Sequence, residues 1–462
     1  MSGNGGPGSV PPGIFKAYDL RGLYGTDMGP ETAELVGRGF ARVLGELRGK
    51  PSEELRVGLG RDMRIEAPEM AAAVRDGLVA EGASVVDAGM VGTEMLYFLV
   101  GSKELDGGAM VTASHNPKAY TGVKLVREGA LALSGDTGIG RVREVIEAGL
   151  GRPPGGGDVE ELDIYEPFWE LAMSFVDAER IGPMKVVVDG GNGMAGSMVG
   201  PLLDRLNLDL TTTYWTPDGE FPDHEPNPLL EKNREFLVDK VRGERAQLGI
   251  AWDGDSDRCF FIDGNGEFVD GDFLTALLAR SLLEKNPGSG VIYDVRASRA
   301  VPDTVAAEGG TSYVNRVGHA FFKLAMREHG AVFGGEVSGH YYFRDFYCAD
   351  TGTIPALLVL ELLSKAGRPL EELVGELRSR YFISGEINSE VDDQQRKMRE
   401  IEDRYSDGRV SHLDGVSVDY DDWHFNVRPS NTEPLLRLNL EALTSVEDME
   451  RRRDEVLELI RS

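Results

Sequence analysis

The chain has 462 residues, which exceeds the usual size of a single hydrophobic core and predicts several domains. Hydrophobic residues make up 41% of it, enough for globular folding, and no apolar run is long enough to span a bilayer. The formal net charge of -29 argues against nonspecific binding to nucleic acid, and the two cysteines provide neither a disulfide framework nor a thiolate metal site.

The chain begins with a Gly/Pro/Ser-rich segment, residues 1–13, that lacks the apolar core of a signal peptide, so we expect a cytoplasmic protein. Short β-branched runs then alternate with amphipathic stretches, which is typical of βα units. The expected strands are 56–59, 84–86, 109–112, 185–189, 208–214, 248–252, 291–293, 311–314 and 331–334. The expected helices are 32–47, 68–81, 138–148, 272–285, 320–328 and 357–365.

Three breaks interrupt this pattern. A Gly/Pro tract at 149–157 is the clearest linker, a second break lies around 258–266, and a third lies near 366–369. The sequence therefore predicts three βα-type segments and then a small α+β domain bounded by helices. The strands expected in that last domain are 409–412, 416–420, 424–428 and 435–441.

A serine and a histidine stand side by side at the end of one apolar run. Residues 108–117 read GAMVTASHNP, and Asn116-Pro117 breaks the chain directly after Ser114 and His115. Ser114 is therefore expected on a constrained loop at a strand end, where open α/β folds place their chemistry.

A second run, residues 253–258, alternates three aspartates in a glycine-containing turn. Asp253, Asp255 and Asp257 resemble the start of an EF-hand loop, but the sixth position is Arg258 and the twelfth is Gly264, where that loop needs glycine and glutamate. Close carboxylates repel one another unless a cation joins them, although a solvated acidic turn is the alternative. The apolar strand before them and the arginine after them favour a small divalent site, most suited to Mg2+. Together with a strand-end serine, it indicates phosphoryl chemistry.

The run Gly191–Gly196 follows an expected strand and fits the dinucleotide pattern G-x-G-x-x-G, with Asp218 at about the right spacing. It supports a rival interpretation, a dinucleotide-dependent oxidoreductase. However, Asp218 opens a Pro/Gly-rich loop instead of ending a strand. We therefore favour a tight strand-to-helix turn.

Two further loops carry polar groups that suit a sugar phosphate. Residues 335–340 contain Glu336, Ser338 and His340, which suit sugar hydroxyls and proton transfer, although an ordinary turn has the same composition. Residues 428–437 gather guanidinium, hydroxyl and amide donors that can hold a phosphate. These donors are Arg428, Ser430, Asn431, Thr432 and Arg437.

Together these loops resemble the α-D-phosphohexomutase superfamily over nearly the whole chain. Within it the sequence is most similar to phosphomannomutases, including the dual phosphomannomutase/phosphoglucomutase type. Members carry phosphoserine, metal, sugar and phosphate loops in this order, and here the loops are 112–117, 253–258, 335–340 and 428–437. Further matches are Tyr18–Gly22, Gly60–Arg64 and Val317–His319.

The resemblance implies three similar α/β domains with mixed sheets and a smaller C-terminal α+β domain around a central cleft. The implied boundaries are 1–155 for the domain with the phosphoserine loop, 156–260 for the metal loop, 261–368 for the sugar loop and 369–462 for the phosphate loop. A monomer or homodimer is expected, with no membrane partner.

The implied reaction moves a phosphoryl group between the 1- and 6-positions of a hexose. Phosphorylated Ser114 donates its phosphoryl group to the sugar, which gives a hexose 1,6-bisphosphate. This intermediate reorients end for end, and its other phosphate returns to Ser114. Mg2+ bound by Ser114 and the three aspartates neutralises charge, and the bisphosphate is the activator. Lys124 is implied as the first choice for proton management, with a pKa depressed by cationic neighbours.

The resemblance also implies roles for the other side chains. His115, Arg21 and His340 are unranked candidates for proton handling or charge stabilisation. Arg258 is expected to steady the phosphoryl group, and Arg61 the phosphoserine loop. The expected substrate contacts are Glu336 and Ser338 on the sugar hydroxyls, His319 beside them, and Arg428, Ser430, Asn431, Thr432 and Arg437 on the distal phosphate.

The hexose itself is less constrained. Mannose phosphates are favoured and glucose phosphates are expected as well. Phosphoglucosamine mutases typically have Gln at the position of Val337 and Gly at that of Asn431, so that alternative is disfavoured. Arg296 stands where many members have Lys, and Asp350-Thr351-Gly352 where many have Asp-Asp-Gly, which leaves the hexose preference open. A catalytically silent sugar-phosphate binder is a further alternative, disfavoured by the intact serine, aspartates and lysine.

Overall fold

The computed structural model describes residues 10–430 and 434–462, which form two compact units. The first contains the chain up to residue 268 together with residues 339–367, and the second contains residues 269–338 and 368–462. Among the described residues, no helix combines the length and the apolar character that a membrane crossing requires.

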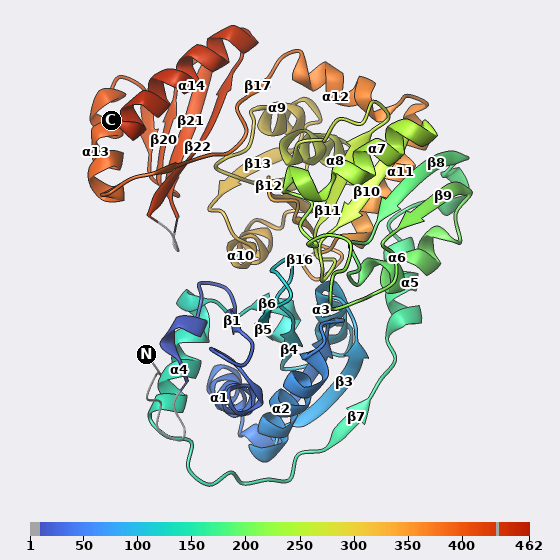
Figure 1. Ribbon diagram of the computed structural model, residues 1–462, viewed down its shortest axis with the longest axis vertical. Helices are drawn as coiled ribbons and strands as arrows, with labels where there is room; N and C mark the ends of the chain where they lie inside the picture. Colours follow the sequence, from blue (N-terminus) through green and yellow to red (C-terminus); the bar gives the residue numbers. More distant parts are fainter. Residues whose placement is uncertain (1–9, 431–433) are drawn as a thin grey trace. The chain divides into compact units, whose positions relative to one another are not determined.

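The N-terminal part of the first unit is a mixed sheet with strand order β1-β5-β4-β2-β3-β7 (Figure 1). The strands β2, β3, β4 and β7 are parallel, and β5 runs antiparallel to both β4 and β1. The strands are β1 (Leu20–Leu23), β2 (Arg56–Arg61), β3 (Ser84–Met90), β4 (Gly107–Val111), β5 (Tyr120–Arg127), β6 (Leu131–Ala132) and β7 (Val159–Glu161).

Helices cover both faces of this sheet. Val57 and Leu59 of β2 lie in a core cluster with side chains of α1, α2 and α4, whereas Gly58 of the same strand lies against Leu99 and Val100 of α3. This follows from the alternation of side chains along a strand. The helices are α1 (Pro30–Arg48), α2 (Ala67–Ala80), α3 (Thr93–Ser102) and α4 (Gly140–Glu147).

A second sheet of the first unit has the order β11-β10-β8-β9, with β11 antiparallel to β10 and the other pairs parallel. Its strands are β8 (Met184–Asp189), β9 (Leu208–Thr213), β10 (Leu248–Trp252) and β11 (Cys259–Asp263). The unit also contains α5 (Tyr165–Met173), α6 (Ala195–Leu203), α7 (Glu235–Glu244), the antiparallel pair β15 (Tyr341–Phe343) and β16 (Ala349–Asp350), and α11 (Thr353–Ala366).

The second unit combines parallel strands with an antiparallel C-terminal sheet. The parallel strands β12 (Gly290–Asp294), β13 (Thr311–Asn315) and β14 (Phe333–Gly335) accompany α8 (Gly271–Lys285), α9 (Ala300–Ala307) and α10 (His319–His329). The C-terminal sheet contains β17 (Phe382–Ile383), β18 (Ile387–Glu390), β19 (Arg409–Ser411), β20 (Val416–Asp419), β21 (Trp423–Pro429) and β22 (Leu435–Ala442). It is accompanied by α12 (Leu370–Arg378), α13 (Gln394–Arg404) and α14 (Val446–Arg461).

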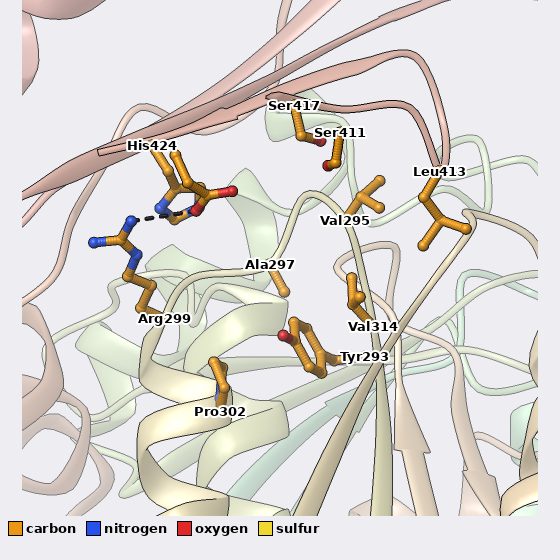
Figure 2. A pocket seen from close by; sticks show the side chains of 11 residues that line it. Tyr293, Val295, Ala297, Arg299, Pro302, Val314, Ser411, Leu413, Ser417 and His424 are labelled. Carbon is orange, nitrogen blue, oxygen red and sulfur yellow. Dashed lines mark hydrogen bonds and ion pairs between the residues drawn. The ribbon is translucent and has the colours of Figure 1, made fainter. Parts of the chain in front are cut away.

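Arg299, directly before α9, fastens the C-terminal sheet to the rest of the second unit. Its guanidinium donates to Asp419 at 3.2 Å and to the carbonyl of Asp421 at 2.9 Å, and its backbone N–H donates to Glu441 at 3.1 Å. A cavity of about 160 Å³ lies beside this contact (Figure 2). It is lined by Tyr293, Val295, Ala297, Arg299, Pro302, Val314, Ser411, Leu413, Ser417, Asp419 and His424.

Two of the expected breaks are corrected by strand pairing. The break expected around 258–266 is wrong, because β11 occupies it and pairs with β10 through Trp252 and Cys259. The boundary expected at residue 260 therefore falls inside a strand. The tract 149–157 contains no helix or strand, as predicted, but it leads into β7, which pairs with β3. The first sheet thus continues past the boundary expected at residue 155.

Candidate active site

Ser114 follows β4 at the carboxyl end of the parallel strands, as predicted. Its backbone has a φ of 50°, in the left-handed region that non-glycine residues seldom adopt, and its side chain is 4% exposed. Its N–H donates to the hydroxyl of Thr112 at 2.8 Å. A strained backbone at a strand end is typical of a functional residue whose surroundings hold it in place.

Arg64 holds the serine loop from behind. Its buried guanidinium donates to the carbonyl of Ser114 at 2.8 Å, of Asn116 at 2.7 Å, of Pro117 at 3.1 Å and of Tyr120 at 3.0 Å. The Arg61 side chain donates to the carbonyl of Asp62 at 3.3 Å, and the role expected of Arg61 stays a prediction. The planar fork of an arginine, with its five N–H donors, suits such a set of carbonyl acceptors.

The three aspartates lie in the hairpin loop between β10 and β11, and this loop meets the serine loop. The Ser114 hydroxyl donates to Asp253 Oδ2 at 2.8 Å. Arg258 donates to the same oxygen at 2.9 Å through Nε and at 2.7 Å through Nη2. All three aspartates are buried. The structure therefore brings together the predicted serine, metal loop and Arg258.

Lys124 of β5 lies between two of these aspartates. Its Nζ is 2.7 Å from Asp255 Oδ2 and 2.6 Å from Asp257 Oδ2, and the side chain is 9% exposed. Burial alone would lower the pKa of Lys124, but the two carboxylates outweigh burial and raise it above the ordinary value. The expected depression of this pKa by cationic neighbours is therefore wrong. As placed, Lys124 is a positively charged hydrogen-bond donor.

The donor set of this loop fits a hard cation. Oxygens of the three aspartates lie within 4.8 Å of one another. Asp255 Oδ1 and Asp257 Oδ1 are buried and have no hydrogen-bond partner among the residues that the structure describes. Burial and the charge of Asp255 raise the pKa of Asp257 well above its ordinary value, which is the response of a carboxyl in excess negative charge. A small oxygen-seeking divalent ion would relieve that excess.

Two histidines and one arginine border this cluster. His115 Nδ1 lies 3.2 Å from Ser114 Oγ, and burial together with the charges of Arg258 and Arg21 lowers the pKa of His115 well below its ordinary value. His340 Nε2 lies 3.8 Å from Asp257 Oδ1 and 3.8 Å from Asp350 Oδ2. Arg21 donates to Asn116 of the serine loop and to Asp19. All five predicted catalytic side chains therefore belong to this unit.

The run Gly191–Gly196 packs against the metal loop. A Cβ on Gly193 would lie 2.7 Å from the carbonyl oxygen of Gly254, and one on Gly196 would lie 1.7 Å from that of Trp215. The N–H of Met194 donates to the Gly254 carbonyl at 2.9 Å. The glycines thus allow close backbone contact in a strand-to-helix turn, as the favoured interpretation predicted.

Sequence reasoning missed Glu94, the second residue of α3. It directly follows Thr93, whose hydroxyl donates to Asp255. Glu94 is fully buried and accepts hydrogen bonds from the hydroxyls of Thr351 and Thr353, the latter at 2.5 Å. Burial raises the pKa of Glu94 to about 8, although the threonine hydroxyls partly oppose the shift. The departure at Thr351 thus supplies a partner for a buried carboxyl.

Glu94 makes the stability of the protein dependent on pH. Between its ordinary pKa of 4.5 and its folded pKa of about 8, only the folded state keeps the proton, so raising the pH favours unfolding by roughly 1.4 kcal/mol per pH unit. Glu94→Gln cannot ionise. We expect its melting temperature to approach that of the wild type at pH 5 and to exceed it increasingly up to pH 8.5, as measured by scanning calorimetry.

A control variant separates this effect from general charge removal. Glu104→Gln, two residues past the end of α3, removes an exposed carboxylate that forms no ion pair with the described residues. Its melting temperature should stay parallel to that of the wild type across the pH range. Parallel curves for Glu94→Gln as well would contradict the assignment of a raised pKa to Glu94.

The sugar-loop residues Glu336 and Ser338 lie in the second unit. Glu336 is buried and accepts the N–H of Gly318 at 2.9 Å, so the loop that begins α10 with His319 is tied to it. Arg296 forms two hydrogen bonds of 2.9 Å to Asp294, which also accepts the N–H of Val337 at 3.0 Å. The end of β12 therefore fixes the backbone of the sugar loop.

The phosphate loop follows β21. Arg428 and Arg437 occupy opposite positions on β21 and β22, and Ser430 is buried beyond them. Both guanidinium groups donate to Glu386, at 2.8 Å and 3.1 Å. Asn431 and Thr432 lie outside the described residues. The structure therefore brings together the two predicted arginines and adds a carboxylate that sequence reasoning missed.

Comparison with known families gives matches along the chain to four models. Residues 12–149, 166–266 and 270–381 match the models described as phosphoglucomutase/phosphomannomutase alpha/beta/alpha domains I, II and III. Residues 386–459 match the C-terminal domain model of the same family. These matches follow one another without overlap.

Individual relatives are similar over nearly their whole length. A protein named phosphohexose mutases from Xanthomonas campestris is 41% identical over 97% of this chain and 99% of its own, and a phosphomannomutase from Escherichia coli K12 is 40% identical over 96% and 98%. A crystal structure of a phosphoglucomutase/phosphomannomutase family protein from Burkholderia thailandensis superposes with a TM-score of 0.87 at 32% identity, covering 98% of each chain.

Proposed function

Because the chain belongs to the phosphoglucomutase/phosphomannomutase family, we propose that it interconverts hexose 1-phosphates and hexose 6-phosphates. It is thus an isomerase, a phosphohexose mutase. The observation that carries this assignment is the contact between the Ser114 hydroxyl and Asp253 at 2.8 Å, inside a buried cluster of three aspartates. A nucleophilic oxygen beside a hard-cation site is the arrangement that phosphoryl transfer requires.

The proposed cycle uses Ser114 as a phosphoryl carrier. The bond between phosphorus and Ser114 Oγ breaks while the phosphorus forms a bond to a sugar hydroxyl, whose proton passes to a neighbouring base. The resulting hexose 1,6-bisphosphate reorients end for end in the site, and its other phosphoryl group is then transferred to Ser114. Trace bisphosphate therefore serves as activator, because it rephosphorylates any Ser114 that has lost its phosphate.

The side chains around Ser114 have different proposed roles according to their charge. Lys124 and Arg258 are buried cations held by the aspartates, so they can stabilise the charge on the transferring group without reorganising. His115 lies close enough to Ser114 Oγ to exchange a proton with it. His340 and Arg21 remain candidates for proton handling or charge stabilisation.

Mg2+ is proposed at Asp253, Asp255 and Asp257, with Ser114 as a further ligand. When bound, it supplies positive charge that neutralises the phosphoryl oxygens. The chain itself contributes the orientation of the oxygens, since Thr93 and Thr112 hold Asp255 in place through their hydroxyls.

The substrate contacts are proposed for the second unit. Glu336 and Ser338 would bind sugar hydroxyls beside His319, and the loop of Arg428, Ser430, Asn431, Thr432 and Arg437 would hold the phosphate that is not reacting. The names of the relatives favour mannose phosphates, and the family description, which includes phosphoglucomutase, supports glucose phosphates as further substrates. The domain boundary expected between residues 368 and 369, the monomeric or homodimeric state and cytoplasmic residence stay predictions from the sequence.

A direct assay tests this function. The purified protein, with Mg2+ and a trace of glucose 1,6-bisphosphate, should convert mannose 1-phosphate and glucose 1-phosphate to their 6-phosphates, and EDTA should stop the reaction. The ratio of the two rates gives the hexose preference. Mass spectrometry should find phosphate on Ser114.

Other outcomes distinguish the alternatives. Activity on glucosamine phosphates alone would favour a phosphoglucosamine mutase. Phosphate on Ser114 without activity on either mannose 1-phosphate or glucose 1-phosphate would point to another hexose. Absence of both turnover and phosphoserine would contradict the mechanism. Binding of NAD(P) would instead support the alternative interpretation as a dinucleotide-dependent oxidoreductase.

A further inference from the structure

Glu386 joins the two arginines of the phosphate loop. It lies between β17 and β18, and its side chain is 24% exposed. Glu386 Oε2 accepts from Arg428 Nη2 at 2.8 Å, and Oε1 accepts from Arg437 Nη1 at 3.1 Å. Each carboxylate oxygen therefore binds a different guanidinium group. The two arginines come from β21 and β22, which are neighbouring strands of the C-terminal sheet (Figure 1).

The pairing of the strands explains why such a carboxylate is needed. Arg428 on β21 and Arg437 on β22 stand directly opposite each other. Like charges at opposite positions of an antiparallel pair repel, and two long side chains would splay apart to reduce that repulsion. Glu386 supplies the negative charge that lets both guanidinium groups point to one place. The same two arginines, together with Arg296, hold its pKa below its ordinary value despite partial burial.

Arg428 and Arg437 each keep N–H donors that Glu386 does not occupy. The Nε atoms of Arg428 and Arg437 are buried and have no hydrogen-bond partner among the described residues. A guanidinium group has five donors in a fixed fork, so one carboxylate oxygen leaves most of them free. Glu386 can therefore hold the groups in place without occupying the donors that a phosphate needs.

Arg296 extends this network to the sugar loop. Its Nη1 lies 3.6 Å from Glu386 Oε2, and its Nη2 lies 2.9 Å from Asp294 and 3.9 Å from Glu336. The planar, branched guanidinium group presents donors in several directions, which suits contact with three carboxylates. The departure from lysine at this position therefore links the residue expected to bind sugar hydroxyls with those expected to bind phosphate.

We propose that Glu386 is a positioning residue for substrate phosphate: it converges Arg428 and Arg437 into one phosphate site and ties that site, through Arg296, to Glu336. The inference rests on the proposed function of the same loop. Glu386 acts through the arginines and does not touch the sugar phosphate itself.

The test is the Glu386→Gln variant. A glutamine has one acceptor and one donor in place of two acceptors, so it can hold one arginine but turns a donor toward the other. We expect the KM for mannose 1-phosphate to rise about tenfold with little change in kcat, because the lost contact serves binding in both the ground and transition states. Glu390→Gln on β18 is the matched control, since Glu390 is exposed and forms no ion pair within the described part of the chain.

A double variant separates positioning from a general structural role. If Glu386 acts through the arginines, Arg428→Lys should raise KM, and adding Glu386→Gln should raise it further by clearly less than the tenfold of the single variant, because only Arg437 is left for Glu386 to hold. Additive effects, an unchanged KM in Glu386→Gln, or a lower KM, as expected of a carboxylate that competes with phosphate, would overturn the proposal.

Binding of mannose 1-phosphate and inorganic phosphate, measured by calorimetry, keeps this test independent of turnover. Wild-type protein that binds mannose 1-phosphate without converting it would contradict the proposed function, while the ratio of the affinities of wild type and Glu386→Gln would still test the inference. If wild type and Glu386→Gln bind with equal affinity and the wild type is active, the positioning role of Glu386 is rejected while the proposed function stands.

Discussion

Ser114→Ala is expected to reduce turnover of both hexose phosphates by at least about 10³-fold, because the group that carries the phosphoryl is removed. The Ser114 hydroxyl is buried and donates a hydrogen bond to Asp253, so the variant loses the oxygen that the fold holds beside the metal loop. Added glucose 1,6-bisphosphate should not restore activity, since the variant has no oxygen to receive its phosphate. Steady-state kinetics and phosphate analysis of the purified variant measure both effects.

A second serine in the site provides the control. Ser256 lies in the metal loop, also has a positive φ, 61°, and is buried, and its hydroxyl has no hydrogen-bond partner among the described residues. Ser256→Ala therefore makes the same chemical change in a similar backbone conformation without removing a described interaction. It should keep most of the activity. Equal losses in both variants would show that the site is merely sensitive to packing, and full activity of Ser114→Ala would contradict the mechanism.

Periodicity predicts most of the fold because most strands are apolar runs between turn residues. The strand expected at 248–252 is β10 without change, and the α/β and α+β character of the chain is confirmed. Periodicity misses α3 because all but its last two residues are buried, so this helix lacks the alternation that marks an amphipathic one. It misses β11 because the glycine-rich turn after that strand resembles a break between domains.

The candidate site could be predicted in part because its loops are contiguous in the sequence. The serine and aspartate loops are recognisable by themselves, and the structure brings them together. Contacts between distant segments could not be predicted. Nothing in the sequence places Lys124 between Asp255 and Asp257, so the expected direction of its pKa shift is wrong. Arg64 belongs to a recognisable motif, but its four carbonyl partners depend on the folded loop.

Glycines in the site have a role that composition alone does not reveal. Gly254 separates Asp253 from Asp255, and a Cβ there would lie 2.6 Å from the carbonyl oxygen of Ser114 and 3.2 Å from Pro226. Gly193 approaches Gly254 from the second sheet, at 2.7 Å for a Cβ on Gly193. The serine loop, the metal loop and the glycine-rich turn thus meet as backbones, with no room for a methyl group.

Gly254→Ala is therefore expected to push the serine and metal loops apart. The nearest atom in the way belongs to backbone, which cannot rotate aside as a side chain can, so the distance between Ser114 Oγ and Asp253 must grow. A displacement of about 1 Å in a phosphoryl-transfer site lowers turnover by about 10²-fold. Kinetics with a titration of Mg2+ measure this loss, and a higher Mg2+ requirement should accompany it because Asp253 and Asp255 flank the new methyl group.

The contrast with a second glycine makes the result specific. In α7, a methyl group added at Gly243 would meet no atom within 4 Å, so Gly243→Ala should keep full activity and gain up to about 1 kcal/mol of stability from its higher helix propensity. Gly193→Ala should resemble Gly254→Ala, because it presses on the same loop from the other side. Loss of activity in Gly254→Ala with an unaltered Gly193→Ala would mean that the serine loop alone, and not the junction of three segments, sets the geometry of the site.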